Sequence, residues 1–377
     1  MHQANNLAII ETILRDRRRF FAEVRDGVEL GQKMRAMLIG GVKMSMAIRR
    51  QNLPNCTVYV TRRIPEAGLR MVREVCKVRL WEGELPPPRE IILREVAGCE
   101  GLLCLLSDPI DAGVIAAAPR LRVISQYAVG VDNIDLAAAT ARGIPVGHTP
   151  GVLTEATADL AFALLMSAAR RIPEGIEIVR AGQWRTWEPL GLLGAGVWKA
   201  TLGIVGLGRI GTAVARRGRG FGMRVLYYDS VRKTDLEAEL GLEYALLDDL
   251  LEQANFVSLH CPLTSETHHL IGEQALRRMK PVAVLINAAR GSIVETDALV
   301  RALREGWIAA AALDVTDPEP LPPDHPLLAL PNCIVVPHIG SATVTTRERM
   351  SVMAAENLLA GLQGKRLPYC ANPGVYE

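Results

Sequence analysis

The stretch Thr201-Leu-Gly-Ile-Val-Gly-Leu-Gly-Arg-Ile-Gly211 decides the fold of this chain. A short apolar run ends in Gly206-x-Gly208-x-x-Gly211, and helix-forming residues follow it. This order is the strand, turn and helix that open a dinucleotide-binding βαβ unit. In such a unit the first glycine makes the tight turn, the second lets the backbone approach a pyrophosphate, and the third lets the helix pack against its strand.

A carboxylate follows these glycines at the distance that a dinucleotide site requires. The next apolar run, 224–228, ends in Asp229, which stands 18 positions after Gly211. An acid at this place accepts hydrogen bonds from ribose hydroxyls and repels a 2′-phosphate. The sequence therefore predicts NAD as the cofactor, while Arg232 and Lys233 close behind leave NADP possible.

The composition bounds the class of protein. With 377 residues, 49% of them hydrophobic, the chain is long enough for two α/β domains with large cores. A net charge of +2 implies no general attraction to nucleic acid or membranes, and the apolar runs are too short to span a bilayer. No secretory signal opens the chain. Seven cysteines, an odd number without metal-ligand spacing, predict a reducing cytoplasm and no metal site.

Strand and helix patterns alternate from residue 56 onward. We expect strands at 56–61, 78–81, 101–106, 121–126, 145–147, 202–205, 224–228, 256–261, 283–287, 308–315 and 334–336. We expect helices at 66–75, 89–96, 135–142, 156–171 with Thr154 as its cap, after the glycine loop, and at 246–254, 272–279, 296–305 and 345–362. The pattern predicts one α/β unit over 54–151, completed by 338–377, and a second over 152–337.

Residues 1–53 differ from the rest of the chain. They hold ten Lys or Arg against five acids, and residues 7–28 carry apolar side chains at helical spacing. The acids argue against a mitochondrial presequence, and a nucleic-acid-binding arm is the weaker alternative. We interpret the segment as a basic extension, helical or disordered, and Met44 or Met46 as an alternative start.

Three polar side chains follow successive strands of the second unit. Arg290, Glu319 and His338 come after the strands predicted at 283–287, 308–315 and 334–336, where ligands of open α/β sheets bind. An arginine fork suits a carboxylate and a ketone oxygen. A histidine can protonate that oxygen as hydride arrives, and a paired glutamate favours its charged form. We therefore predict reduction of a carbonyl beside a carboxylate.

These residues resemble the D-isomer-specific 2-hydroxyacid dehydrogenase family. The resemblance runs over 58–368, and its motifs are Gly-Leu-Gly-Arg-Ile-Gly (206–211), Asn-Ala-Ala-Arg-Gly (287–291), Leu-Asp-Val-x-x-x-Glu-Pro (313–320) and Pro-His-Ile-Gly-Ser-Ala (337–342). It implies an α/β fold of two Rossmann- or flavodoxin-like, doubly wound parallel-sheet domains with a cleft between them.

The resemblance also assigns roles. It makes Arg290, Glu319 and His338 the catalytic trio. It also places Asp314 at the nicotinamide carboxamide and Thr157 at a cofactor phosphate. It implies cofactor contacts at Gly206, Gly208, Arg209, Ile210, Gly211, Asp229, Cys261, Pro262, Thr267, Ala288, Ala289, Arg290, His338 and Gly340. It implies substrate contacts at Ser107, Val129, Gly130, Arg290, His338, Ser341 and Trp187.

Within the family the resemblance is strongest to glyoxylate/hydroxypyruvate reductases, through residues 127–135, 184–190 and 314–322. It implies reduction of glyoxylate to glycolate and of hydroxypyruvate to D-glycerate, in a homodimer built on the long helix. Trp187, or Trp184 in second place, is the expected limit on substrate size in the partner's site. A phosphoglycerate or D-lactate type of dehydrogenase and an NAD-sensing, corepressor-like binding protein stay open as alternatives.

Overall fold

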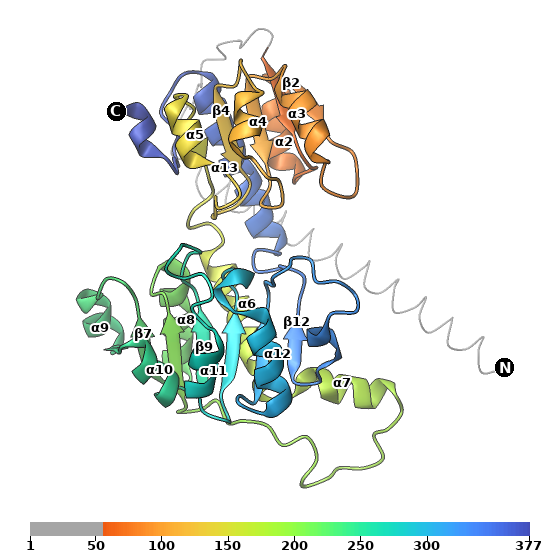
Figure 1. Ribbon diagram of the computed structural model, residues 1–377, viewed down its shortest axis with the longest axis vertical. Coiled ribbons are helices and arrows are strands. Elements are labelled where there is room, and N and C mark those ends of the chain that lie inside the picture. The colour runs from red at the N-terminus through yellow and green to blue at the C-terminus, as the bar shows by residue number, and fades with distance from the viewer. Residues whose placement is uncertain (1–55) are drawn as a thin grey trace, which may run out of the picture. The chain divides into compact units, whose positions relative to one another are not determined.

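The computed structural model describes residues 56–377, so the expectations for residues 1–53 lie outside the described part. Within that part the chain forms two sheets, one of five strands and one of seven, and all neighbouring strands within each sheet run parallel (Figure 1). The α/β class with two doubly wound parallel sheets is confirmed. No helix within residues 56–377 is long and apolar enough to cross a membrane.

The five-stranded sheet has the order β2-β1-β3-β4-β5, which is the flavodoxin-like order. Its strands are β1 (Thr57–Val60), β2 (Lys77–Leu80), β3 (Gly101–Cys104), β4 (Val123–Gln126) and β5 (Val146–Gly147). The helices between them are α2 (Glu66–Arg73), α3 (Arg89–Val96), α4 (Ala112–Ala116) and α5 (Leu136–Ala141). β3 and β4 are buried on both faces, as expected for parallel strands covered by helices.

The last long helix, α13 (Val344–Leu362), packs on this first sheet, beside α2 and β4 (Figure 1). Ser125 in β4 donates a hydrogen bond of 2.8 Å to the carbonyl of Ala354. The approach is close enough that a Cβ on Gly361 would lie 2.5 Å from Val123. With α13 the chain therefore returns to a sheet whose strands lie more than 190 positions earlier.

The seven-stranded sheet has the order β12-β11-β10-β9-β6-β7-β8. Its strands are β6 (Thr201–Val205), β7 (Arg224–Tyr228), β8 (Glu243–Tyr244), β9 (Phe256–Leu259), β10 (Val284–Asn287), β11 (Ala310–Leu313) and β12 (Cys333–Val335). Its helices are α6 (Thr154–Ala169), α7 (Ile172–Arg180), α8 (Arg209–Gly220), α9 (Thr234–Leu240), α10 (Leu247–Gln253), α11 (Glu273–Arg278) and α12 (Thr296–Glu305). The order reverses between β6 and β9, so the glycine loop after β6 stands at the topological switch point where such sheets bind ligands.

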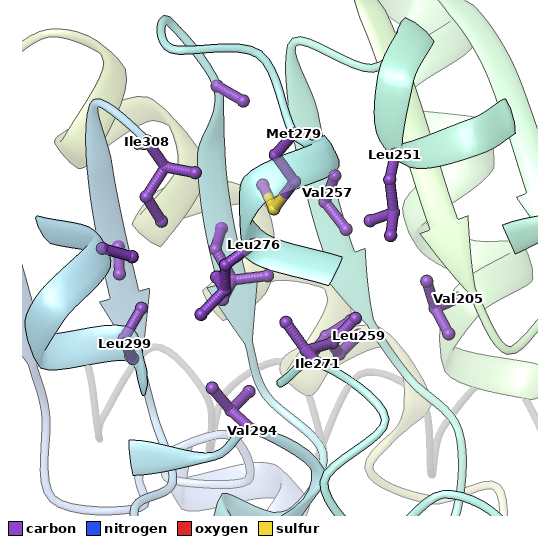
Figure 2. Packing of buried hydrophobic residues seen from close by; sticks show 14 of the residues in the cluster. Val205, Leu251, Val257, Leu259, Ile271, Leu276, Met279, Val294, Leu299 and Ile308 are labelled. Carbon is purple, nitrogen blue, oxygen red and sulfur yellow. The ribbon is translucent and has the colours of Figure 1, made fainter. Parts of the chain in front are cut away.

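Side chains that alternate along the strands of this sheet pack into two separate hydrophobic cores. Leu202 and Ile204 of β6 join one cluster with α6 and α8, whereas Val205 joins a second cluster with α10, α11 and α12. Figure 2 shows the second cluster, in which Leu251, Leu276 and other apolar side chains close over β9 and β10. Burial on both faces leaves the ends of the strands as the places where polar side chains can reach solvent.

Some elements differ from the sequence-based expectations. The short elements α4, α7, α9 and β8 were not predicted. The elements α4, α9 and β8 are too short to show a clear periodicity, whereas α7 carries Ile172, Ile176 and Val179 at helical spacing, a signal that was missed. The predicted helix at 156–171 is α6, and Thr154 is its first residue rather than its cap. The capping position is Leu153, and no side chain caps the helix there.

Candidate active site

The glycine loop after β6 has the geometry of a nucleotide cradle. Gly206 has φ = 93°, and a Cβ there would lie 2.5 Å from the backbone nitrogen of Cys261. Glycine is therefore required on both steric and conformational grounds. A Cβ on Gly211 would lie 2.1 Å from the carbonyl oxygen of Gly206, so the helix can pack here only without a side chain. Gly208, by contrast, faces open space.

The N-terminus of α8 is free to receive an anion. No side chain caps the helix at Gly208, and the N–H of Thr212 donates to the carbonyl of Gly208 at 2.9 Å. The N–H groups of Arg209 and Ile210 come before that bond and need an outside acceptor. A pyrophosphate would supply that acceptor and would benefit from the helix dipole. The residues present therefore fit a dinucleotide.

Asp229 lies at the end of β7, beside the glycine loop. Its Oδ2 accepts a hydrogen bond of 2.8 Å from the N–H of Leu207, and its Oδ1 accepts one of 3.1 Å from the N–H of Val231. Arg232 is engaged elsewhere, since its Nε and Nη2 donate to Glu237 at 2.8 and 2.9 Å. Near the place of a ribose, the structure thus presents a fixed carboxylate and a cation already paired.

His338 and Glu319 form a close pair. Nδ1 of His338 lies 2.6 Å from Oε1 of Glu319, and both side chains are about one-third exposed. Burial raises the pKa of Glu319, but the hydrogen bond and the charge of His338 outweigh it and hold that pKa below its usual range. An ionised carboxylate only accepts hydrogen bonds, so Nδ1 carries the hydrogen of this bond. Nε2 is then the ring nitrogen left to exchange a proton.

Asp314 holds the backbone that carries His338. Its two carboxylate oxygens accept hydrogen bonds from the N–H groups of Ile339, at 2.6 Å, and Gly340, at 2.9 Å. The residue is 2% exposed, and burial raises the pKa of Asp314, an effect that the two N–H groups only partly offset. A Cβ on Gly340 would lie 3.0 Å from Asp314 and 3.3 Å from the hydroxyl of Thr157, so these three residues stand together.

Arg290 follows β10 on a loop that Asn287 braces. Nδ2 of Asn287 donates to the carbonyl of Arg290 at 2.8 Å, and Oδ1 accepts from the N–H of Ala289 at 3.1 Å. The guanidinium of Arg290 is paired with Asp132, which follows β4 of the five-stranded sheet. A Cβ on Gly130 would lie 1.7 Å from Nη2 of Arg290, so only glycine admits the guanidinium here.

The structure brings several of the predicted residues together. Gly130 contacts Arg290, and His338, Glu319, Asp314, Gly340 and Thr157 are linked by the bonds and close approaches given above. Other predicted residues lie along the same loops. These are Ala288 after β10, Ser341 after His338, Val129 next to Gly130, Ser107 after β3, and Cys261, Pro262 and Thr267 after β9.

Two of those residues have local bonds that fix their loop. The hydroxyl of Thr267 donates to the carbonyl of Pro262 at 2.6 Å and accepts from the N–H of Thr264 at 2.8 Å. Burial raises the pKa of Cys261 to about 11, so its thiol stays protonated at neutral pH. The backbone of this segment, rather than the sulfur, is what approaches Gly206.

Trp187 and Trp184 lie apart from this set. They belong to the segment between α7 and β6, and they are 79% and 69% exposed. Neither ring joins a core cluster within residues 56–377. The structure of one chain therefore leaves both tryptophans on the surface.

Sequence reasoning missed Asp132 as a site residue. Its signal was its position, because it is a charged residue in the loop that follows a buried strand, four positions after Ala128 and two after Gly130. Its pairing with Arg290 joins positions 158 apart in the chain, which no local pattern reveals.

The chain is similar to known proteins over most of its length. Residues 162–340 match the model of the D-isomer specific 2-hydroxyacid dehydrogenase NAD binding domain. A glyoxylate reductase of Korarchaeum cryptofilum is 56% identical over 321 residues, which are 85% of this chain and 97% of that relative.

Solved structures agree with this similarity. A protein of Thermus thermophilus has a TM-score of 0.79 and 51% identity, and the match covers 84% of this chain and 99% of that one. An NADPH-dependent glyoxylate/hydroxypyruvate reductase of Sinorhizobium meliloti, solved with NADP and malonate, has a TM-score of 0.75 and 31% identity over 84% of this chain and 97% of its own.

Proposed function

Because this chain belongs to the D-isomer-specific 2-hydroxyacid dehydrogenase family, we propose that it reduces glyoxylate to glycolate and hydroxypyruvate to D-glycerate. It is an NAD(P)-dependent oxidoreductase that acts on 2-hydroxy acids and their 2-oxo counterparts. The observation that carries the proposal is the pair of His338 and Glu319 at 2.6 Å, close enough to Arg290 that the charge of its guanidinium also lowers the pKa of Glu319.

The cofactor, when bound, supplies the hydride that adds to the carbonyl carbon of the substrate. His338 supplies the proton: Nε2 donates to the carbonyl oxygen as its π electrons become a lone pair, so the product is a hydroxyl group. Glu319 holds Nδ1 of the ring and compensates the positive charge that the ring carries before it gives up its proton. The products are the 2-hydroxy acid and a neutral imidazole, which takes up a proton from solvent before the next turnover.

Arg290 binds the carboxylate of the substrate in this proposal. Its guanidinium is planar and charged at every physiological pH, and it offers parallel N–H groups that match a carboxylate. The N–H groups of Val129 and Gly130 lie on the loop beside the guanidinium and add backbone donors. When the carboxylate is held in place, the ketone is held in place relative to His338 as well. Binding energy is thereby used to orient the ketone for proton transfer.

NADH is the cofactor that the site favours. Asp229 is already oriented by Leu207 and Val231, and a carboxylate there repels a 2′-phosphate. Arg232 is paired with Glu237 and is not free to neutralise such a phosphate. Lys233 remains nearby, so the proposal is a preference for NADH and not an exclusion of NADPH.

We propose a homodimer as the working form. None of the nine residues of α7 is buried, and the apolar side chains of Ile172, Ile176 and Val179 are exposed. Trp184, Trp187, Leu190 and Leu193, in the segment that follows, are exposed as well. Exposed apolar side chains in this number are typical of a protein interface. The seven free cysteines fit a reducing compartment, and we place the enzyme in the cytoplasm.

The test is loss of NADH absorbance with purified protein and four substrates in parallel: glyoxylate, hydroxypyruvate, pyruvate and a bulky 2-oxo acid. We expect rapid turnover of the first two. Preference for pyruvate would point to a D-lactate type of enzyme. Binding of NADH without turnover of any substrate would favour a cofactor-sensing binding protein and would contradict the proposal.

A further inference from the structure

Asp132 and Arg290 are joined side by side. Nε of Arg290 lies 3.1 Å from both carboxylate oxygens of Asp132, and Nη2 lies 2.9 Å from Oδ1. Nη1 donates to the carbonyl of Ala289 at 2.8 Å. These contacts engage one edge of the guanidinium, the edge formed by Nε and Nη2, and fix the plane of the group from two directions.

The remaining hydrogen-bonding capacity follows from the chemistry of arginine. A guanidinium has five N–H groups, and the contacts with Asp132 and Ala289 use one on each nitrogen. One N–H on Nη1 and one on Nη2 are left. Two N–H groups on the two terminal nitrogens make the second fork of the group, which matches a carboxylate as well as the first one does.

Two features of the surrounding structure keep Asp132 and Arg290 paired in this way. Gly130 leaves room for Nη2, because a Cβ there would lie 1.7 Å from that nitrogen and 2.7 Å from Oδ1 of Asp132. Burial raises the pKa of Asp132, but the hydrogen bond and charge of Arg290 outweigh it, so that this pKa lies below its usual range. The carboxylate is therefore ionised at neutral pH and holds the guanidinium with a charge-assisted pair.

We propose that Asp132 is a positioning residue for substrate binding: it holds Arg290 by the Nε–Nη2 edge and presents the Nη1–Nη2 edge to the carboxylate of the 2-oxo acid. The inference rests on the proposed function, since it concerns the arginine that binds the substrate there. Asp132 belongs to the loop after β4 and Arg290 to the loop after β10, so the substrate-binding fork is assembled from both sheets. Without Asp132 the long side chain of Arg290 has other rotamers available, and its Nη1–Nη2 edge is no longer held toward the carboxylate of the substrate.

The experiment compares Asp132→Asn with a matched control, Glu243→Gln. Arg224 and Glu243 form the same side-on pair, with Nε 3.0 Å from both oxygens, but on β7 and β8, far along the chain from the loops of the site. We expect Asp132→Asn to lower kcat/KM for glyoxylate by about 10- to 100-fold, with a raised KM, because small misplacements of a binding group have effects of this size. The affinity for NADH stays unchanged, and Glu243→Gln behaves as the wild type. Asp132→Glu, which keeps the charge, restores part of the loss.

Binding of oxamate, an unreactive carboxylate analogue, to the protein–NADH complex gives a second readout through tryptophan fluorescence. We expect weaker binding by Asp132→Asn than by the wild type. Wild-type kinetics in Asp132→Asn would overturn the inference, and so would a lower KM, which would mean that Asp132 competes with the substrate. If Asp132→Asn does not fold, Asp132→Ser takes its place, and wild-type kinetics in that variant overturn the inference.

Failure of the proposed function is recognised separately. A wild-type protein that reduces none of the four 2-oxo acids contradicts the proposed function whatever Asp132 does. Oxamate binding then tests Asp132 by itself, and equal affinity in wild type and Asp132→Asn, or binding by neither, overturns the inference.

Discussion

Glu319 and His338 are paired at 2.6 Å although the backbone of His338 has φ = 52°, in the left-handed region that residues other than glycine rarely adopt. The two N–H groups that follow His338 are bound by the buried carboxylate of Asp314. Asp314 therefore holds the strained turn through the backbone N–H groups of Ile339 and Gly340, while Glu319 holds the imidazole ring of His338. Strain of this kind persists only where the surrounding structure determines it, and it is frequent at functional sites.

Replacing His338 separates binding from chemistry. We expect His338→Gln to keep the affinity for NADH and to lower kcat for glyoxylate by about 10²- to 10⁴-fold, since only proton transfer is removed. Stopped-flow fluorescence of NADH and steady-state turnover measure the two effects. His268→Gln, on an exposed turn, is the control. A variant of His338 that turns over at the wild-type rate would show that another group donates the proton.

Replacing Asp314 tests the support of the strained turn. Asp314→Asn keeps one carbonyl oxygen as acceptor, so one of the N–H groups of Ile339 and Gly340 loses its partner. An unsatisfied buried N–H costs about 1–3 kcal/mol, and we expect both a lower free energy of unfolding and a lower kcat. Urea titrations and turnover measure these quantities. Asp324→Asn, on an exposed loop, is the control, and an Asp314→Asn protein as stable as the wild type contradicts the role.

The ion pairs of the site predict how stability depends on pH. The pKa values of Glu319 and Asp132 are lowered in the folded protein, so each carboxylate binds its proton less readily than in the unfolded chain. Their contribution is present above the unfolded values, about pH 4, and is lost as the pH falls through the lower folded values.

The measurement is the free energy of unfolding at pH 7, 5 and 3.5 for the wild type and for Glu319→Gln. The variant lacks one of these carboxylates, so we expect its stability to fall less between pH 5 and 3.5. A variant with the same or a steeper acid dependence would mean that Glu319 does not contribute in this way.

The cofactor preference is tested at Asp229. Asp229→Ser removes the charge that repels a 2′-phosphate while keeping a short hydrogen-bonding side chain. We expect the ratio of kcat/KM for NADPH to that for NADH to rise by about tenfold or more, since removing a single unfavourable charge contact of about 1.4 kcal/mol has this effect. Glu239→Gln, an exposed acid paired with Arg216, is the control. An unchanged ratio would show that Asp229 does not select the cofactor.

Trp187 links the proposed dimer to substrate size. We expect sedimentation to find a mass about twice the 41.0 kDa of one chain. In Trp187→Ala, turnover of a bulky 2-oxo acid should rise relative to that of glyoxylate, because a large ring no longer limits the space. Trp198→Ala, which removes another exposed ring, is the control. A monomer whose selectivity does not change in Trp187→Ala contradicts both parts of the proposal.

Much of the fold could be predicted because its signals are local. Parallel strands buried on both faces are short apolar runs, and β3, β9 and β10 are such runs. The helices with clear apolar periodicity, such as α12, were also predicted close to their bounds. The short helices α4 and α9 were missed, and Thr154 was wrongly taken as the cap of α6, because the end of a helix depends on contacts as much as on residue type.

The sequence by itself determined the glycine loop, the acid that follows it and the three polar residues at successive strand ends, because each depends on residues close together in the chain. Only the tertiary structure decided that Asp132 pairs with Arg290, that Asp314 supports the backbone after His338, and that α13 packs on the first sheet. These contacts join residues that lie 25 to 229 positions apart. No local periodicity encodes such a contact, since its free energy appears only once the chain has folded and has brought residues that are distant in the sequence together.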